Sequence, residues 1–188
     1  SCTTNCLAPV VDIINKEFGI KKGYMTTVHS YTNDQVILDV AHKKGIYSRR
    51  GRAGAMNIVP TGTGAASAIG LVIPELKGKL DGSSLRVPTA TGSVIDLTLE
   101  LNKSVTKEEI NSVFENNSNE TLKITYDPIV SSDVIGSNVG ALVDGLLTSV
   151  LDTENGQLVK IVAWYDNEYG YSTQMVRTAK YLGNITRN

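Results

Sequence analysis

Two hydrophobic periodicities divide the chain into predicted helices and strands. Apolar residues recur at helical spacing from Leu7 to Phe18, and Gly19 follows at the position where such a helix commonly ends. Residues 23–29 alternate as a strand does, with Thr27 and His29 on the same face. The chain is therefore predicted to open with a helix followed by a strand.

Later residues show the same two patterns in an irregular order. Further helices are predicted from the N-cap Thr63 to Leu76, at 106–116 with Thr106 and Glu109 as its capping box, and at 168–182. An extended piece is predicted at 84–88, and strands are predicted at 94–101, 122–126, 142–151 and 158–164. Because strands and helices do not alternate regularly, we predict one α+β domain over residues 1–188. Its sheet is expected to be mixed, largely antiparallel, and covered by helices on one face.

Residues 31–54 carry neither periodicity. The basic residues of this stretch are Lys43, Lys44, Arg49, Arg50 and Arg52. An aperiodic stretch of this length inside a compact domain is usually functional or forms an assembly arm. We therefore expect this loop to take part in binding or in subunit contacts.

Composition and charge narrow the class of protein. The 188 residues are 41% hydrophobic and 20% charged, as in an ordinary globular domain, and the net charge is −1. A global field that would attract nucleic acid or an anionic membrane is therefore not expected, and no run of about 18 apolar residues predicts a membrane span. Two cysteines four residues apart do not form a disulfide framework, which favours a reducing, cytoplasmic location.

A thiol lies directly before the first predicted helix. Cys2 occupies the positive end of the helix dipole, which favours a thiolate over a thiol. His29 ends the following strand, where its imidazole would complete a nucleophile pair with Cys2. Cys6, one turn deeper, is predicted to pack in the core. A zinc site formed by these residues and His42 is disfavoured because a second pair at ligand spacing is missing.

Several polar groups are of the kind that bind phosphate. They are the hydroxyls of Ser1 and Thr3, the helix N-terminus after Thr63-Gly64, and the guanidinium groups of Arg52 and Arg86. Arg86 is the most informative, because a charge inside an apolar strand needs a partner. If two anion sites flank the thiolate, the substrate is a small phosphorylated carbonyl compound. The polar junction 164–171 fits either a strand end with a helix cap or a second part of this site.

Five segments together resemble the C-terminal catalytic domain of the phosphorylating glyceraldehyde-3-phosphate dehydrogenases. The segments are Ser1-Cys2-Thr3-Thr4-Asn5-Cys6-Leu7-Ala8-Pro9, Thr27-Val28-His29-Ser30-Tyr31-Thr32-Asn33-Asp34-Gln35, Pro60-Thr61-Gly62-Thr63-Gly64-Ala65-Ala66, Arg86-Val87-Pro88-Thr89 and Trp164-Tyr165-Asp166-Asn167-Glu168. They occur in the order found in the family and cover almost the whole chain. A catalytic helix start is rarely the first segment of a gene, so we expect the chain to be the C-terminal part of a longer protein.

The resemblance implies a mechanism and a set of site residues. Cys2 would attack the aldehyde of glyceraldehyde 3-phosphate, and His29 would polarise the thiol and act as base for hydride departure. The Cys2 amide and His29 would stabilise the oxyanion, and inorganic phosphate would cleave the thioester to an acyl phosphate. The other implied residues are Thr32 and Arg86 for the substrate phosphate, Ser1, Thr3, Arg52, Thr63 and Gly64 for the attacking phosphate, and Asn167 and Tyr171 for NAD.

The resemblance also implies an assembly and a cofactor. Residues 39–55 correspond to the S-loop, which reaches the cofactor of a neighbouring subunit in a homotetramer. Val40-Ala41 replaces the Leu-Pro of NAD-preferring members, which leaves NAD and NADP open. The dinucleotide-binding fingerprint of the family's N-terminal domain is absent from this sequence. The chain alone is therefore expected to bind NAD weakly and not to turn over. Thr91-Gly92 replaces the common Asn-Val, with no function attached to the change.

Two alternatives stay open at this point. An erythrose-4-phosphate dehydrogenase shares the opening segment but differs after the histidine and around the phosphate loop, so glyceraldehyde 3-phosphate is favoured. An isolated domain without catalysis, acting in oligomerisation or interaction, is the alternative from another class. The reactivity of Cys2 compared with that of Cys6 separates the last reading from the enzymatic ones.

Overall fold

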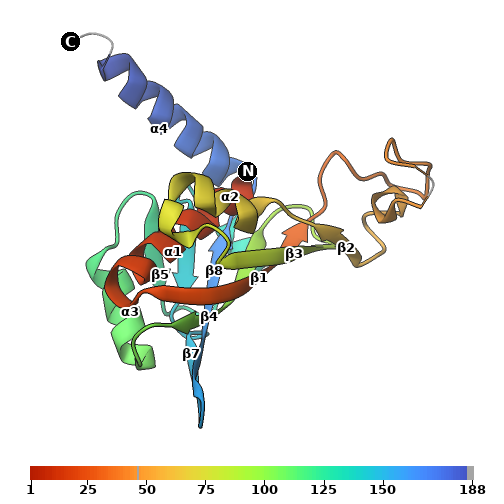
Figure 1. Cartoon of the computed structure of the whole chain (residues 1–188). Helices are drawn as coiled ribbons and strands as arrows, with labels where there is room; N and C mark the ends of the chain where they lie inside the picture. Colours follow the sequence, from red (N-terminus) through yellow and green to blue (C-terminus); the bar gives the residue numbers. More distant parts are fainter. Residues whose placement is uncertain (46, 186–188) are drawn as a thin grey trace.

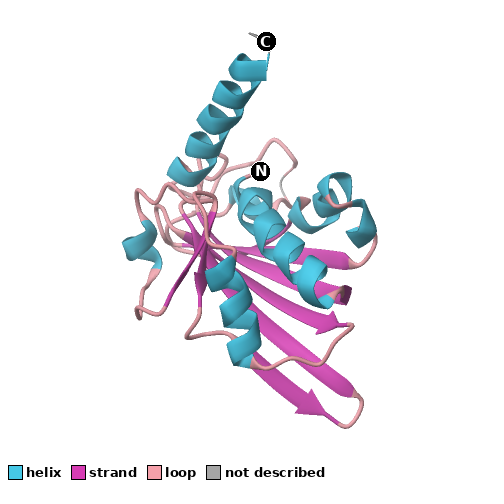
Figure 2. Cartoon of the chain, turned by 90° about the vertical axis from the view of Figure 1, so that its left-hand side faces the viewer, coloured by secondary structure: helices cyan, strands magenta, loops and turns pink. Residues whose placement is uncertain are grey.

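The computed structural model describes residues 1–45 and 47–185, which form a mixed sheet with helices packed on one face (Figure 2). The helices are α1 (Cys2–Phe18), α2 (Ala65–Val72), α3 (Lys107–Asn116) and α4 (Tyr169–Ile185). The strands are β1 (Ile20–Ser30), β2 (Val59–Gly62), β3 (Leu80–Val87), β4 (Ser93–Leu101), β5 (Leu122–Thr125), β6 (Ala141–Asp144), β7 (Ser149–Thr153) and β8 (Gly156–Tyr165). Short 3₁₀ helices are η1 (Arg49–Gly51), η2 (Pro74–Leu76) and η3 (Ser131–Val134). The predicted α+β class is confirmed.

The sheet places β1 between two strands that come much later in the sequence. The strand order is β2-β3-β1-β4-β8-β6-β5, with β7 paired to β8. β1 runs parallel to β3 and antiparallel to β4. In the register of the parallel pair, His29 lies opposite Arg86. The carboxyl ends of β1 and β3 therefore bring together two residues that the sequence analysis singled out separately.

The core lies between the sheet and the helices α1, α2 and α3. Residues 93, 95, 97, 99 and 101 of β4 are buried while the residues between them are half-buried, which is the alternation predicted for this strand. Helix α1 buries Leu7, Val10 and Ile14 in this core. Gly19 ends the helix with a backbone φ of 71°. Full burial of one such aliphatic side chain contributes about 1.5–3 kcal/mol. The N-terminal segment is thus held firmly beside the sheet.

Strand β2 was not predicted, and β3 starts four residues before the extended piece predicted at 84–88. The bounds of two further elements also differ from the prediction. The N-cap of α2 is Gly64, not Thr63, and the helix ends at Val72 because Pro74 starts a separate 3₁₀ turn. The hydroxyl of Thr63 still accepts a hydrogen bond from the Ala65 amide at 3.1 Å. The strand predicted over 142–151 is broken, because the Asp144 carboxylate accepts from two amides just after it and folds the chain into a turn.

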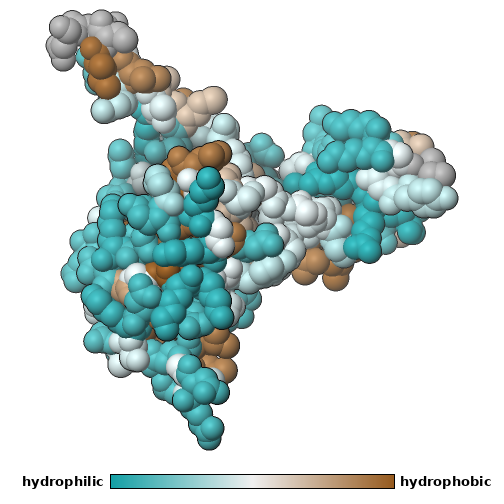
Figure 3. All heavy atoms as spheres, in the orientation of Figure 1, coloured by the Kyte–Doolittle hydropathy of each residue, from teal (hydrophilic) through white to brown (hydrophobic). Residues whose placement is uncertain are grey.

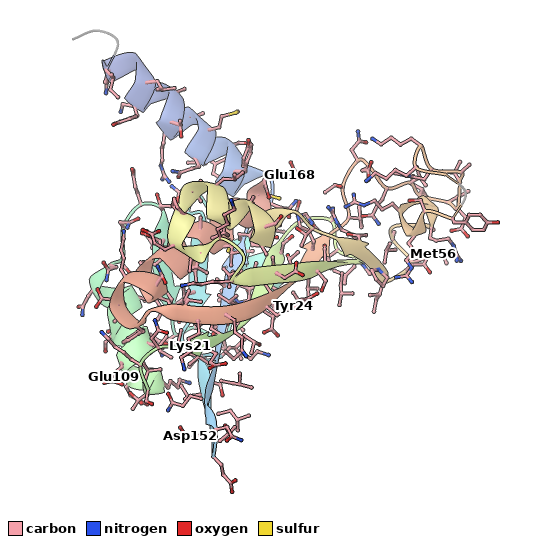
Figure 4. All side chains as sticks on the ribbon, viewed as in Figure 1. Lys21, Tyr24, Met56, Glu109, Asp152 and Glu168 are labelled. Carbon is pink, nitrogen blue, oxygen red and sulfur yellow. The ribbon has the colours of Figure 1, made fainter. Side chains whose placement is uncertain are left out.

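Two parts of the chain project from this body. The loop between β1 and β2 extends to one side, with Met56 exposed near its base, and α4 extends to another (Figures 1 and 4). Both carry exposed apolar side chains, among them Ile37 and Leu38 on the loop and Met175 and Val176 on the helix. Brown patches on α4 and under the loop are visible in Figure 3. Within the residues described, no helix has the length and apolarity needed to cross a membrane.

Candidate active site

Cys2 and His29 meet where the start of α1 lies beside the end of β1. The Cys2 Sγ atom is 3.3 Å from the His29 Nε2 atom, a distance at which sulfur and nitrogen share a hydrogen bond. Ser1 is the N-cap of α1, and its hydroxyl accepts from the Thr4 amide at 3.1 Å. The thiol therefore lies in the first turn of a 17-residue helix, within the field of its amide dipoles. Cys6 is fully buried, and burial raises the pKa of its thiol well above the ordinary value.

The protonation of His29 follows from its surroundings. Its Nδ1 atom lies 2.7 Å from the Ser30 carbonyl oxygen, which can only accept, so Nδ1 carries the hydrogen. Nε2 is then the free base that faces Cys2. Burial, aided by the positive charges of Arg86 and Arg50, lowers the pKa of the imidazole to about 4. His29 is thus neutral at physiological pH and able to accept the thiol proton.

Arg86 and Thr32 form a donor group beside this pair. The Arg86 Nη1 atom donates to the Thr32 hydroxyl at 3.0 Å and to the Ser30 carbonyl at 3.2 Å. Burial and the charge of Arg50 lower the pKa of Arg86, yet among the described residues its Nε atom is buried without a hydrogen-bond partner. A buried guanidinium nitrogen with an unused hydrogen favours an anionic ligand.

The basic loop contributes Arg50 to the site region, whereas Arg52, the arginine expected there, lies elsewhere on the loop. The charge of Arg50 acts on both His29 and Arg86, and its guanidinium contacts Asp34 at 2.7 Å and Thr61 at 3.5 Å. Arg50 and Thr63 line a cleft of about 670 Å³ between the loop and β2. The Arg52 side chain is 62% exposed and pairs with Asp39 at 2.9 Å. An aperiodic loop offered no sequence signal to separate the two arginines.

The remaining hydroxyl candidates have different surroundings. Thr63 and Gly64 lie between β2 and α2, and α2 packs beside the start of α1 (Figure 1). The hydroxyl of Thr3 is buried and lies 2.8 Å from the Tyr165 hydroxyl, which is also 2.8 Å from the hydroxyl of Thr27. Thr3 is therefore occupied in fixing α1 to the sheet. Tyr165 was not among the predicted site residues, although its ring contacts that of His29 edge-on at a centroid distance of 6.0 Å.

Asn167 lies on the other side of the histidine, between β8 and α4, and Tyr171 follows it along the chain. The Asn167 side chain is buried, and its Oδ1 atom accepts from Ser30 Oγ at 2.8 Å. Its Nδ2 atom donates to Glu168, at the foot of α4 in Figure 4. Tyr171 is exposed in the first turn of α4. Ser30 thus contacts both His29 and Asn167.

The arrangement defines a class of site before any relative is considered. A thiol with a neutral imidazole at hydrogen-bond distance is the geometry of a nucleophile and its base. Arg86 and Arg50 add positive charge on one side, which suits an anionic substrate. In the part of the chain that the structure describes, no cluster of three or more histidine, cysteine, aspartate or glutamate residues is placed to hold a metal ion.

Comparison with known proteins gives the family. Residues 1–167 match the model of the family described as the C-terminal domain of glyceraldehyde 3-phosphate dehydrogenase. Two relatives named glyceraldehyde-3-phosphate dehydrogenase, from Clostridium pasteurianum and Streptococcus pyogenes, are 54% and 55% identical over 187 residues. The matches cover 100% of this chain but 56% and 55% of those proteins, so the chain spans about half their length. The chain belongs to the glyceraldehyde-3-phosphate dehydrogenase C-terminal domain family.

Proposed function

We propose that this chain is the substrate-binding and chemical half of a phosphorylating glyceraldehyde-3-phosphate dehydrogenase. The observation that carries the proposal is the 3.3 Å approach of the Cys2 thiol to a neutral, oriented His29 beside the Arg86–Thr32 pair. The names of the relatives support the same reading. The full-length protein would oxidise glyceraldehyde 3-phosphate, with inorganic phosphate and NAD, to an acyl phosphate.

The first step forms a bond between Cys2 and the aldehyde carbon. As Sγ attacks, the thiol proton passes to His29 Nε2 and from there to the carbonyl oxygen, giving a thiohemiacetal. Nδ1 stays bonded to the Ser30 carbonyl throughout, so the ring keeps its orientation while Nε2 exchanges the proton. The orphan amides at the start of α1 lie beside the thiol and would stabilise the negative oxygen.

The second step oxidises the thiohemiacetal to a thioester. His29 Nε2 removes the hydroxyl proton while the hydrogen on carbon leaves as hydride. NAD, when bound, supplies the acceptor for that hydride. The low pKa of His29 keeps the imidazole in its basic form before each transfer.

The third step releases the product and needs two anion sites. We place the phosphate of the substrate at Arg86 and Thr32, where a buried guanidinium nitrogen still has a hydrogen to donate. We place the attacking phosphate near the cleft that Arg50 and Thr63 line. Attack of its oxygen on the thioester carbonyl gives the acyl phosphate and returns Cys2 as a thiolate, which recovers its proton from His29.

Asn167 and Tyr171, at the junction of β8 and α4, fit a nicotinamide. Asn167 presents its Nδ2 atom away from the three donors that hold its oxygen, so it offers a hydrogen to a carboxamide oxygen. Tyr171 lies nearby with an exposed ring. Asn167 and Tyr171 would hold this end of NAD, or of NADP, and the chain alone is expected to bind either weakly.

We also propose that copies of the full-length protein assemble with one another, and that the protein works in the cytoplasm. The loop over residues 39–55 and the exposed apolar side chains beside it, including Ile37, Leu38 and Ile58, suit contacts with a neighbouring subunit. A homotetramer of the full-length protein is the expected form.

The test is NADH formation by the full-length gene product, followed by absorbance with glyceraldehyde 3-phosphate and phosphate. We expect activity that depends on phosphate, prefers this substrate to erythrose 4-phosphate, and disappears in Cys2→Ser. A Cys6→Ser variant serves as the control, because Cys6 is buried in the core away from solvent. Absence of NADH formation by the wild-type protein would overturn the proposal.

A further inference from the structure

Ser30 contacts both halves of the candidate site, His29 and Arg86 on one side and Asn167 on the other. It lies at the end of β1, is fully buried, and all of its polar groups have partners. Its carbonyl oxygen accepts from His29 Nδ1 at 2.7 Å and from Arg86 Nη1 at 3.2 Å. Its amide donates to Ser93 Oγ at 3.2 Å, and its hydroxyl donates to Asn167 Oδ1 at 2.8 Å. The backbone of Ser30 thus binds the base His29, and its side chain binds Asn167 on the cofactor side.

The hydrogen bonds around Asn167 fix which way its amide faces. Ser93 Oγ accepts the Ser30 amide, so its own hydrogen is free to go to Asn167 Oδ1, 3.1 Å away. The Gly92 amide, which can only donate, lies 3.2 Å from the same oxygen. Three donors therefore converge on Oδ1, and a flipped amide would turn its NH₂ group against them. Nδ2 must face the opposite side, where one of its hydrogens goes to Glu168.

Gly92 is adapted to this arrangement. Its φ is 94°, and an added Cβ atom would lie 2.2 Å from the Ser131 carbonyl oxygen. A side chain here would shift the backbone and move the amide away from Asn167. The glycine at this position therefore lets the chain aim this third donor at Asn167.

We propose that Ser30 is a positioning residue that orients His29 through its carbonyl and Asn167 through its hydroxyl. The inference rests on the proposed function, because it assigns the outward Nδ2 hydrogen of Asn167 to the carboxamide oxygen of NAD. Because Asn167 Oδ1 is held inward, Asn167 offers a ligand only the hydrogen on Nδ2. This site therefore prefers NAD, whose carboxamide oxygen is a good hydrogen-bond acceptor, to an analogue whose sulfur at the same position is a poor one.

The test separates the hydroxyl from the carbonyl by Ser30→Ala in the full-length protein. Affinities for NAD and for its thionicotinamide analogue are measured by fluorescence titration, and Cys2 alkylation is measured in parallel. We expect about fivefold to tenfold weaker binding of NAD, from the loss of one buried hydrogen bond. We also expect a smaller preference for NAD over the analogue, and a Cys2 alkylation rate within about twofold of wild type. Ser84→Ala, at a buried serine of β3, is the matched control and should change none of these.

Unchanged affinity and preference in Ser30→Ala would overturn the inference, and so would a loss of Cys2 reactivity of the same size. If the wild-type protein fails to bind NAD, the proposed function fails, and NMR of the 188-residue chain tests the inference alone. The Nδ2 hydrogens of Asn167 should then show nuclear Overhauser contacts to Glu168 and not to Ser93. In Ser30→Ala their exchange with solvent should be faster, and equal exchange in both proteins would contradict the assignment.

Discussion

Replacing His29 by glutamine should remove a large part of the pH dependence of the chain's stability. The imidazole is buried, and its pKa is lowered from 6.5 to about 4, first by burial and then by the charges of Arg86 and Arg50. The folded state therefore binds this proton more weakly than the unfolded state does. The contribution of His29 to stability is therefore fully present above about pH 6.5, falls as the pH drops through the window between 6.5 and about 4, and is absent below that window.

The size of the effect follows from the two pKa values. A tenfold change in proton affinity corresponds to about 1.4 kcal/mol, so the whole window contributes at most about 3 kcal/mol. Between pH 7 and pH 4.5 the wild-type chain should lose about 2 kcal/mol more than His29→Gln. Asp34, whose pKa its bond to Arg50 lowers to about 2, and the other carboxylates are common to both proteins and cancel in the difference.

The assay is urea unfolding of both proteins at several pH values, followed by circular dichroism. Glutamine changes the absolute stability, so the comparison uses only the slope of the unfolding free energy against pH. A wild-type curve that falls more steeply than the His29→Gln curve as the pH drops supports a buried neutral imidazole. Parallel curves from pH 7 to 4.5 would refute the reasoning, because His29 would then titrate as it does in the unfolded chain.

Two further predictions concern other contacts of the site. Tyr165→Phe removes the hydroxyl shared by Thr3 and Thr27, and leaving buried hydroxyls unpaired should lower the free energy of unfolding by about 1–3 kcal/mol, measured by urea titration. An unchanged unfolding midpoint would contradict this bridge. Arg50→Ala should raise the KM for phosphate of the full-length protein about tenfold, whereas Arg52→Ala should change it less than twofold. Equal effects would show that the loop is arranged differently.

Much of the fold was predictable because local signals agreed with packing. The apolar stripe of α1, the capping box before α3 and the alternation in β4 each determine an element without help from distant residues. The apolar residues on both sides of Asp144 predict one continuous strand, but the turn at Asp144-Gly145 breaks it, because the Asp144 carboxylate binds the amides that follow. Thr63 is predicted as the N-cap of α2, but the N-cap is Gly64. Thr63 lies one residue before the cap, and its hydroxyl still accepts from the Ala65 amide.

The site could be predicted only where sequence neighbours or strand ends placed its residues. The end of β1 put His29 near the start of α1, and the parallel register then added Arg86. The choice between Arg50 and Arg52 depends on how an aperiodic loop folds back over β2, which no periodicity encodes. The contacts of Tyr165 with Thr3 and of Asn167 with Ser30 join residues 162 and 137 positions apart. Only the three-dimensional packing reveals these pairs.

The proposed chemistry depends most on the pairing of Cys2 with His29, and alkylation of this chain tests that pairing directly. Wild type and His29→Gln are treated with iodoacetamide at pH 7, and modification of each cysteine is followed by peptide mass spectrometry. We predict that Cys2 reacts far faster than the buried Cys6, and that His29→Gln slows Cys2 by about tenfold or more. Equal, slow labelling of both cysteines, or a Cys2 rate that does not depend on His29, would contradict the account.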